Sequence, residues 1–187
     1  MSSPRIIAGK AKGLRLQSVP GDSTRPITDR VKEALFNILA TDIVDASFLD
    51  LFGGTGSVAI EALSRGASLA RMIELNQAAV ATIKRNLEFT RLQDHGEVVH
   101  SDAFVYLKRP ADRCFDYIYV APPQYKTLWQ KTMLGIDANP AWLSEDAWVI
   151  VQIHPLEYEK LALANLEEFE QRKYGSTMLI FYERKAG

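Results

Sequence analysis

Residues 31–39 carry apolar side chains at the spacing of an amphipathic helix. These side chains recur at i, i+3, i+4, i+7 and i+8, which places them on one face of the helix. Thr28 or Asp29 lies just before this run and suits the N-cap position, where a side-chain oxygen accepts a backbone N–H. The apolar positions of the predicted helix are Val31, Ala34, Leu35, Ile38 and Leu39.

After residue 47, short apolar runs alternate with helical patterns. One helix is predicted to end at Gly66, and another is predicted to be capped by Asn76. This alternation predicts an α/β fold with an open, mostly parallel sheet and helices on both faces, whose ligands lie beyond the carboxyl ends of the strands. Strands are predicted at residues 48–52, 69–74, 97–100, 115–120, 147–153 and 176–183. The apolar faces of the two helices are predicted to be Val58, Ala59, Ala62 and Leu63, and Val80, Ile83 and Leu87.

The N-terminal residues differ from the rest of the chain in charge. Residues 1–32 hold seven basic and two acidic side chains, whereas the remainder has a net charge of −6 and the whole chain −1. A basic patch on an acidic body is typical of an arm that docks on phosphates, although a merely solvated terminus has the same composition. Short β-like stretches at 5–7 and 14–16 predict a small β-hairpin. We therefore expect a basic N-terminal hairpin or arm at residues 1–25 and a main domain at residues 26–187.

Composition narrows the class of protein. The 187 residues suffice for one domain, and 47% hydrophobic and 24% charged residues are typical of a soluble protein with a sizeable core. No apolar run approaches the roughly 18 residues of a membrane helix, and no secretory signal pattern is present. The basic N-terminal stretch superficially resembles a transit peptide, but prolines and glycines interrupt the helix that such a peptide would form. The lone cysteine, Cys114, excludes an internal disulfide, and the three histidines lack metal-ligand spacing. We expect a cytoplasmic monomer without membrane contact or bound metal.

A glycine-rich loop, Asp50–Ser57, follows the first predicted strand. Its glycines allow positive φ and let a ligand approach the backbone closely, and the helix that begins near Ser57 points free N–H groups at that place. Gly54, Gly56 and Ala59 also match the dinucleotide fingerprint G-x-G-x-x-G/A, and a tight turn without any ligand would use the same glycines. The loop predicts a cofactor site without identifying the cofactor.

Acidic residues follow or end the next two predicted strands. Glu74 can accept hydrogen bonds from both hydroxyls of a ribose, a group that nicotinamide cofactors and S-adenosylmethionine share. Asp102, followed by Ala103, can accept from the amino group of an adenine, although it is equally suited to cap a helix. Asp50 favours S-adenosylmethionine, because a carboxylate beside the glycines attracts an ammonium group and repels a pyrophosphate.

The loop after the fourth predicted strand reads Tyr-Val-Ala-Pro-Pro-Gln-Tyr over residues 119–125. Its two prolines stiffen the backbone and leave carbonyl groups free to accept hydrogen bonds, and the neighbouring aromatic ring can stack on a base. The stretch resembles the (Asp/Asn)-Pro-Pro-(Tyr/Phe) motif of methyltransferases that act on exocyclic amines.

With four further stretches, this loop makes the chain similar to a bacterial family of class I S-adenosylmethionine-dependent methyltransferases, which modify a guanine N2 of small-subunit (16S) ribosomal RNA. The resemblance covers nearly the whole chain and is strong through about residue 125. The most specific of the stretches is Arg25–Asn37. The others are Arg5–Gly9, Asp50–Gly56 and Ile73–Asn76.

This resemblance implies a Rossmann-like sheet of seven strands with the last one antiparallel, and an S-adenosylmethionine-dependent methyltransferase domain at residues 26–187. It also implies small-subunit ribosomal RNA, or the small ribosomal subunit, as partner. Residues implied to bind the cofactor are Thr28, Arg30, Asp50, Phe52, Gly54, Gly56, Glu74, Leu75, Asp102, Ala103 and Pro122. Residues implied to contact RNA are Arg5, Lys10, Lys12, Arg15, Arg25 and Arg30.

The catalytic loop departs from the family motif at two positions. Ala121 stands where the motif has Asp or Asn, and Gln124 stands where it has Tyr or Phe. The usual side chain accepts a hydrogen bond from the amine and pulls its nitrogen toward sp³ geometry, and losing it lowers the rate on the order of 10²–10³-fold. We hypothesise that Gln124 and Tyr125 replace the missing functions while the Pro122 carbonyl still accepts. The catalytic set implied by the motif is Ala121, Pro122, Pro123, Gln124 and Tyr125.

Three other interpretations stay open. An adenine-N6 methyltransferase would use the same loop. Ala121 also suits a catalytically impaired relative that binds the cofactor and ribosomal RNA as an assembly factor. A nicotinamide-dependent dehydrogenase leaves the Pro-Pro loop and Arg25–Asn37 unexplained.

Overall fold

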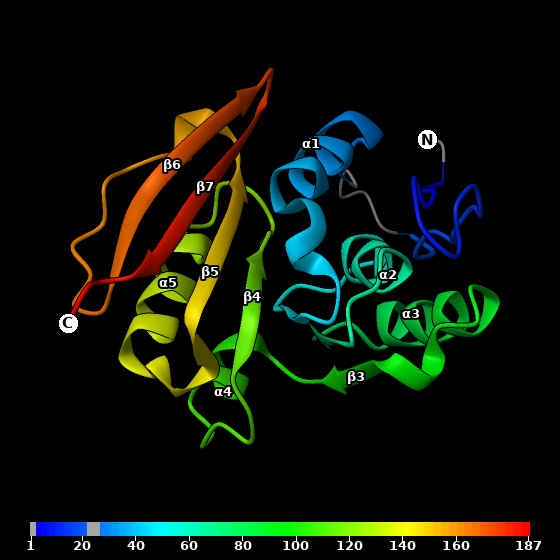
Figure 1. Ribbon diagram of the computed structural model, residues 1–187, viewed down its shortest axis with the longest axis horizontal. Coiled ribbons are helices and arrows are strands. Elements are labelled where there is room, and N and C mark those ends of the chain that lie inside the picture. The colour runs from blue at the N-terminus through cyan, green and yellow to red at the C-terminus, as the bar shows by residue number, and fades with distance from the viewer. Residues whose placement is uncertain (1–2, 22–26) are drawn as a thin grey trace.

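The computed structural model describes residues 3–21 and 27–187 and contains a seven-stranded sheet (Figure 1). The strand order is β3-β2-β1-β4-β5-β7-β6, in which the first five are parallel and β7 is antiparallel to both of its neighbours. This confirms the predicted fold, including the antiparallel last strand. The strands are β1 (Ser47–Asp50), β2 (Leu69–Glu74), β3 (Gly96–His100), β4 (Phe115–Val120), β5 (Leu143–Ile153), β6 (Leu166–Tyr174) and β7 (Thr177–Arg184).

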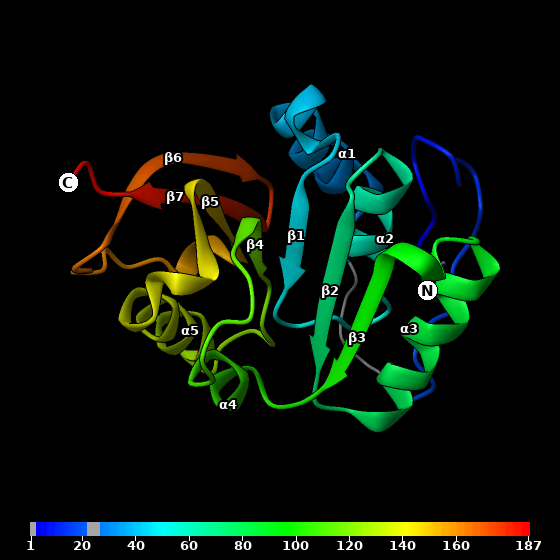
Figure 2. The same ribbon diagram turned by 60° about the horizontal axis from the view of Figure 1, so that its bottom comes forward.

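Helices cover both faces of the sheet (Figure 2). Because successive strand residues point to opposite faces, the strands contribute alternately to two apolar clusters, one with α1, α2 and α3 and the other with α4 and α5. The helices are α1 (Asp29–Leu39), α2 (Ser57–Ser64), α3 (Gln77–Phe89), α4 (Ala103–Leu107) and α5 (Leu128–Ala138). Short 3₁₀ turns are η1 (Ala40–Ile43), η2 (Gln93–His95), η3 (Pro140–Trp142) and η4 (Pro155–Glu157). Among the described residues, no helix is long and apolar enough to cross a membrane.

Two predicted helix caps are present. Thr28 Oγ1 accepts from Val31 N at 3.3 Å, and this cap begins α1. Asn76 Oδ1 accepts from two backbone N–H groups at the start of α3. The caps satisfy donors that have no partner within the helix, which is why these polar residues lie at the boundaries.

The four predicted apolar residues of α2 are buried, and its other four residues, which the apolar pattern did not mark, are buried as well. The N-terminal segment covers the face that a surface helix would expose. Ser64 O accepts from Lys10 N at 2.8 Å, and Glu61 accepts from the backbone N–H groups of Ile7 and Ala8 at 2.8 and 3.1 Å. Gly9 allows this close approach, since a Cβ there would lie 1.9 Å from Ser64 O.

The predicted N-terminal β-hairpin is reduced to a single antiparallel bridge between Arg5 and Arg15. Backbone hydrogen bonds from Ile6 N to Leu14 O and from Gly13 N to Ile6 O close the turn at 2.9 and 2.8 Å. The segment is therefore an ordered loop held on α2 rather than two regular strands.

Two features of the sheet were not predicted from the apolar pattern. β5 begins at Leu143, four residues before the predicted start of that strand. The pattern assigned no strand to Leu166–Tyr174, where only Leu166 is buried and most residues are charged. β6 pairs with β7 alone and is an edge strand, where charged residues protect the free edge from pairing with other chains.

Candidate active site

Asp50 ends β1 at the carboxyl edge of the sheet and is only 2% exposed. Its Oδ1 accepts from Phe52 N at 3.0 Å, and no hydrogen bond from the described residues reaches its Oδ2. Burial raises the pKa of Asp50 well above its ordinary value, the Phe52 N–H opposes this increase, and the nearby Glu74 carboxylate adds to it. A ligand ammonium group would offset the cost of burying this carboxylate, so the residue fits the amino-acid end of S-adenosylmethionine.

The glycine loop after β1 is bound to the end of β2. Glu74 Oε2 accepts from Gly54 N at 2.8 Å, and Glu74 Oε1 accepts from Asn76 N at 2.9 Å. A carboxylate has about four acceptor positions, so both oxygens retain capacity for the hydroxyls of a ribose. Leu75, the next residue in the chain, is 64% exposed, and its contact with a cofactor stays a prediction.

Gly54 and Gly56 adopt positive φ of 58° and 84°, and Gly56 is the N-cap of α2. The Gly54 N–H donates to Glu74 at the end of β2, and the Gly56 N–H donates to Gly53 O within the turn. Phe52 is partly buried and packs against the apolar cluster around α4 and α5. These positions agree with the predicted loop, and their contacts with a cofactor stay predictions.

Asp102 caps α4 directly after β3. Its Oδ1 accepts from Phe104 N at 2.8 Å and from Val105 N at 3.0 Å, so the alternative role as a helix cap is present in the structure. No hydrogen bond from the described residues reaches its Oδ2, which is free to accept from an adenine amino group. Ala103 is buried at the first position of α4. The predicted adenine contact is compatible with the cap.

The register of the parallel strands brings these residues to one edge. Asp50 lies opposite Met72 of β2 and Tyr119 of β4, and Glu74 lies opposite His100 of β3. The ends of β1, β2, β3 and β4 are therefore neighbours, at the edge where parallel sheets bind ligands.

The predicted catalytic loop leaves β4 at this edge, beside Asp50. Ala121 and Pro122 are partly buried, whereas the side chains from Pro123 to Thr127 are exposed. Tyr125 has a positive φ of 64° and a side chain 64% exposed, so its ring is presented to solvent. A non-glycine residue in this conformation is strained and persists only where surrounding contacts hold it.

Glu157 is the residue that holds the loop, and the sequence analysis missed it. Its Oε1 accepts from Tyr125 N at 2.8 Å, while its Oε2 accepts from His154 N at 3.2 Å. The His154 ring lies 5.8 Å from the Tyr125 ring, between centroids. Glu157 and His154 form a capping box around η4, so a Glu three residues after a cap was an available signal for local structure. The contact with Tyr125 joins residues 32 positions apart and has no local signal.

The predicted RNA-binding residues fall into separate groups. Lys10, Lys12 and Arg15 are exposed on the N-terminal segment, and Arg30 is exposed on the first turn of α1. Arg5 forms an ion pair with Asp29 at 2.6 Å, so it also has a structural role.

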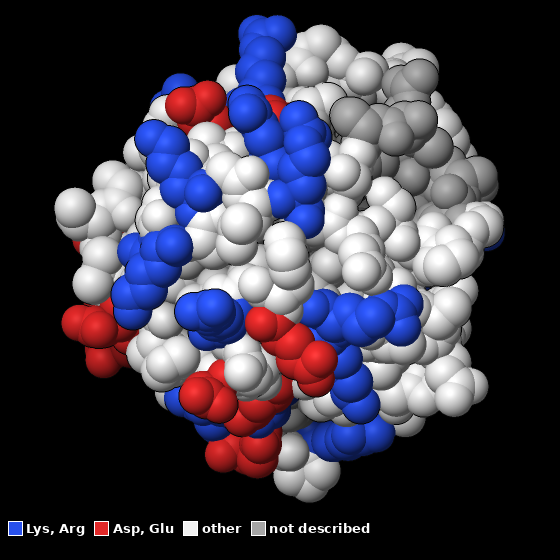
Figure 3. Space-filling model, turned by 90° about the vertical axis from the view of Figure 1, so that its right-hand side faces the viewer, with Lys and Arg blue, Asp and Glu red and all other residues white. Residues whose placement is uncertain are grey.

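Arg25 lies outside the described residues. Basic side chains are numerous on the face formed by the N-terminal segment and α3, among fewer acidic ones (Figure 3). α3 adds the exposed Lys84 and Arg85 to the basic side chains of the segment. Thr28 uses its Oγ1 for the helix cap, and its predicted contact with the cofactor stays a prediction.

The strand order, with β7 antiparallel, and the ligand edge at the strand ends are those of the class I methyltransferase fold. Residues 4–183 match the family described as conserved hypothetical protein 95, and the chain belongs to that family.

Individual relatives cover most of the chain. Ribosomal RNA small subunit methyltransferase D of Escherichia coli (strain K12) is 34% identical over 182 residues, which are 97% of this chain and 90% of that protein. The solved structure of yhhF from Escherichia coli is 33% identical, with a TM-score of 0.88 over 100% of both chains. An RNA methyltransferase from Salinibacter ruber, solved with S-adenosyl-L-homocysteine, is 15% identical with a TM-score of 0.66 over 86% of this chain and 94% of that one, a likeness of fold alone.

Proposed function

We propose that the protein transfers a methyl group from S-adenosylmethionine to the exocyclic N2 amine of a guanine in small-subunit ribosomal RNA. The observation that carries this proposal is the pairing of β1 with β4, which sets the Pro-Pro loop beside Asp50 and the glycine loop. The Escherichia coli relative named for small-subunit ribosomal RNA methylation and the exposed basic residues of the N-terminal segment support RNA as the substrate.

The residues at the strand ends would bind and orient the cofactor. Asp50 would face the ammonium group, Glu74 the ribose hydroxyls and Asp102 the adenine amino group. When bound, S-adenosylmethionine supplies a methyl group made electrophilic by its sulfonium. The glycine loop, which Glu74 holds in place, would orient the bound cofactor toward the Pro-Pro loop.

The Pro-Pro loop would activate the amine. A guanine N2 is a poor nucleophile because its lone pair is delocalised into the ring. Acceptance of its N–H groups by the Pro122 carbonyl and the Gln124 amide oxygen would localise that pair and disperse charge as the methyl arrives. The exposed Tyr125 ring would stack on the base, and the methylated amine would lose its proton to solvent.

The test is transfer of tritiated methyl groups to small ribosomal subunits that lack their natural guanine-N2 methylation, followed by nucleoside mass spectrometry. We expect N2-methylguanosine from these subunits and no incorporation into fully methylated ones. N6-methyladenosine would instead establish the adenine-N6 activity. No transfer alongside measurable cofactor binding would favour the impaired assembly factor, which the lack of a side-chain acceptor at Ala121 makes the second candidate.

A further inference from the structure

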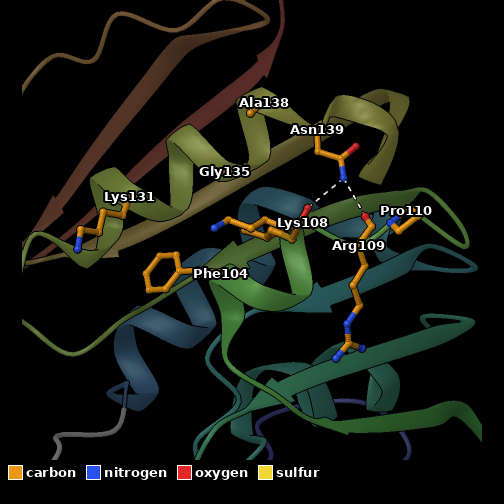
Figure 4. Close-up of a pocket in the computed structure, with 9 residues that line it drawn as sticks. Phe104, Lys108, Arg109, Pro110, Lys131, Gly135, Ala138 and Asn139 are labelled. Carbon is orange, nitrogen blue, oxygen red and sulfur yellow. Dashed lines mark hydrogen bonds between the residues drawn. The ribbon is translucent and has the colours of Figure 1, made fainter.

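A groove of about 820 Å³ lies between α4 and α5, on the sheet face opposite α1, α2 and α3 (Figure 4). Phe104 and Leu107 of α4 and Gly135 of α5 contribute its apolar part. A Cβ on Gly135 would lie 3.2 Å from Leu107 Cδ1, so any larger residue there would crowd the apolar surface. Small and apolar groups of two helices thus form this part of the groove.

Three basic residues line this apolar surface. Lys108 extends from the end of α4 and Lys131 from α5 on the other side, whereas the Arg109 side chain points away from α5 (Figure 4). All three are exposed, and none of them forms an ion pair with a carboxylate of the described residues. No acidic residue lines the groove in the described parts of the chain. The three basic residues lie together although residues 33–187 carry a net charge of −6.

The groove begins next to the predicted cofactor site. Phe104 follows Asp102 and Ala103 in the chain, and its N–H donates to Asp102 Oδ1 at 2.8 Å. Arg109 Nη2 lies 3.4 Å from Ser101 Oγ, and its guanidinium lies over the Tyr106 ring at 5.7 Å. A polynucleotide strand that places one base at the carboxyl edge can therefore continue along α4.

We propose that this groove binds a single-stranded stretch of the substrate RNA that flanks the target guanine. Lys108 and Lys131 contact its phosphates from the two sides, and one base packs against Phe104. Unpaired cations around an aromatic and apolar surface match the chemistry of single-stranded RNA, which joins a charged backbone to flat rings. This inference rests on the proposed function, since it assumes that RNA is the substrate.

The test compares Lys108→Ala/Lys131→Ala with a charge-matched control, Lys160→Ala/Lys173→Ala, whose lysines are exposed near and on the edge strand β6. Filter binding measures the Kd for naked small-subunit ribosomal RNA over a range of salt, and calorimetry measures the Kd for S-adenosylmethionine. Two lost phosphate contacts should raise the RNA Kd on the order of tenfold near 0.15 M salt and reduce the salt slope by about 1.4. The cofactor Kd and the control pair should be unchanged.

Phe104→Leu tests the stacking contact, because leucine keeps apolar volume and removes the ring. Its matched control is Phe89→Leu, at an exposed ring at the end of α3. Loss of one base stack should weaken RNA binding by about tenfold in the first variant alone. Ultraviolet cross-linking of wild-type protein to the RNA should label a peptide that contains Phe104.

Equal effects of the groove and control pairs on RNA binding, or no effect of either, would overturn the inference. If wild-type protein still methylates subunits in that case, the proposed function survives. Weaker binding of the groove variant to assembled subunits, but not to naked RNA, would indicate a ribosomal protein as occupant and would also overturn it. If wild-type protein neither binds RNA nor methylates subunits, the proposed function fails and the groove proposal fails with it.

Discussion

Glu74 Oε2 accepts a hydrogen bond of 2.8 Å from Gly54 N, so the end of β2 holds the loop that follows β1. The other oxygen of the same carboxylate accepts from Asn76 N, which precedes α3. One side chain therefore fixes two backbone segments at the carboxyl edge before any ligand binds. This preorganisation lowers the entropy that the cofactor site must lose on binding.

Replacement of Glu74 by glutamine should affect both stability and cofactor binding. The amide has one acceptor oxygen, so either Gly54 N or Asn76 N loses its partner, and the free energy of unfolding should fall by about 1–2 kcal/mol. The Kd for S-adenosylmethionine, measured by calorimetry, should rise about tenfold or more. The exposed Glu88→Gln on α3 is the control, and equal cofactor affinity in both variants would contradict the role of Glu74.

Asp50→Asn should have opposite effects on stability and on cofactor binding. Because burial raises the pKa of Asp50, the folded chain holds this proton more tightly than the unfolded chain. In the cofactor-free wild type, the contribution of Asp50 to the free energy of unfolding therefore falls as pH rises from about 4 toward the raised pKa. Above that pKa the contribution falls no further, because Asp50 is ionised in both the folded and the unfolded chain. The variant lacks this loss, so its free energy of unfolding relative to wild type should increase with pH over that window.

The same substitution should weaken cofactor binding by about 10²-fold, since the ammonium group loses its counter-charge. Wild-type affinity should itself fall as pH drops below the raised pKa of Asp50, and binding near that pKa should release a proton. Calorimetry in buffers of different ionisation enthalpy measures this release. Asp94→Asn, an exposed carboxylate in η2, is the control and should leave both quantities unchanged. Proton release that persists undiminished in Asp50→Asn would assign the titration to another group.

A buried ion pair joins the N-terminal segment to the domain. Lys32 Nζ lies 3.3 Å from Glu61 Oε1 and donates to Arg5 O and to Ser57 Oγ, with the two charged side chains 1% and 0% exposed. Burial lowers the pKa of Lys32, and the attraction of Glu61 opposes that shift.

Lys32→Met should reduce the free energy of unfolding by about 3–5 kcal/mol, because it leaves Glu61 buried without this partner. Urea denaturation measures the loss, and the N-terminal segment should become more sensitive to protease. Lys84→Met, on the exposed face of α3, should change stability by less than about 0.5 kcal/mol. Arg65 Nε also lies 2.8 Å from Glu61 Oε2. Equal stability of the two variants would show that this second ion pair suffices to compensate the buried Glu61 carboxylate.

Sequence patterns predicted the elements whose signals are local. α1 followed from its 3.6-residue apolar period, and β2 and β4 followed from short apolar runs. The sequence analysis missed β6 because this strand is stabilised by pairing with β7 at the sheet edge. Its charged sequence has no apolar alternation that would predict a strand. The complete burial of α2 depends on a segment about 50 residues away.

The candidate site divides in the same way. Glu74 and Asp102 were predicted because each ends or follows an apolar run, and Asp50 because it precedes the glycines of the loop. The strand register brings the ends of these strands to one edge. The contact of Glu157 with Tyr125 and the placement of Lys108 and Lys131 along one groove depend on packing between distant elements. No spacing within a single element predicts such pairs.

Glu157 should act as a positioning residue for the catalytic loop. Glu157→Ala leaves Tyr125 N and His154 N without an acceptor, which frees the strained loop. Methyl-transfer kinetics should show kcat lower by about 10–100-fold with the cofactor Kd unchanged, because misplacement affects only the reacting geometry. Glu157→Gln retains an acceptor and should recover most of this loss, whereas the exposed Glu159→Ala should resemble wild type. A loss that Gln does not recover, or one that appears in cofactor affinity, would contradict positioning.

The absence of an acceptor at Ala121 makes a paired experiment decisive for the chemistry of the loop. If the Gln124 amide oxygen accepts from the target amine, Gln124→Ala should lower kcat on the order of 10²-fold in methyl transfer to undermethylated subunits. Adding Ala121→Asn to that variant should restore much of the rate, because it returns an acceptor to the position at which the related motif carries one. Tyr125→Phe, which keeps the ring, should leave kcat near the wild-type value. If Gln124→Ala transfers methyl at the wild-type rate, the Gln124 hypothesis is wrong and the Pro122 carbonyl alone serves the amine.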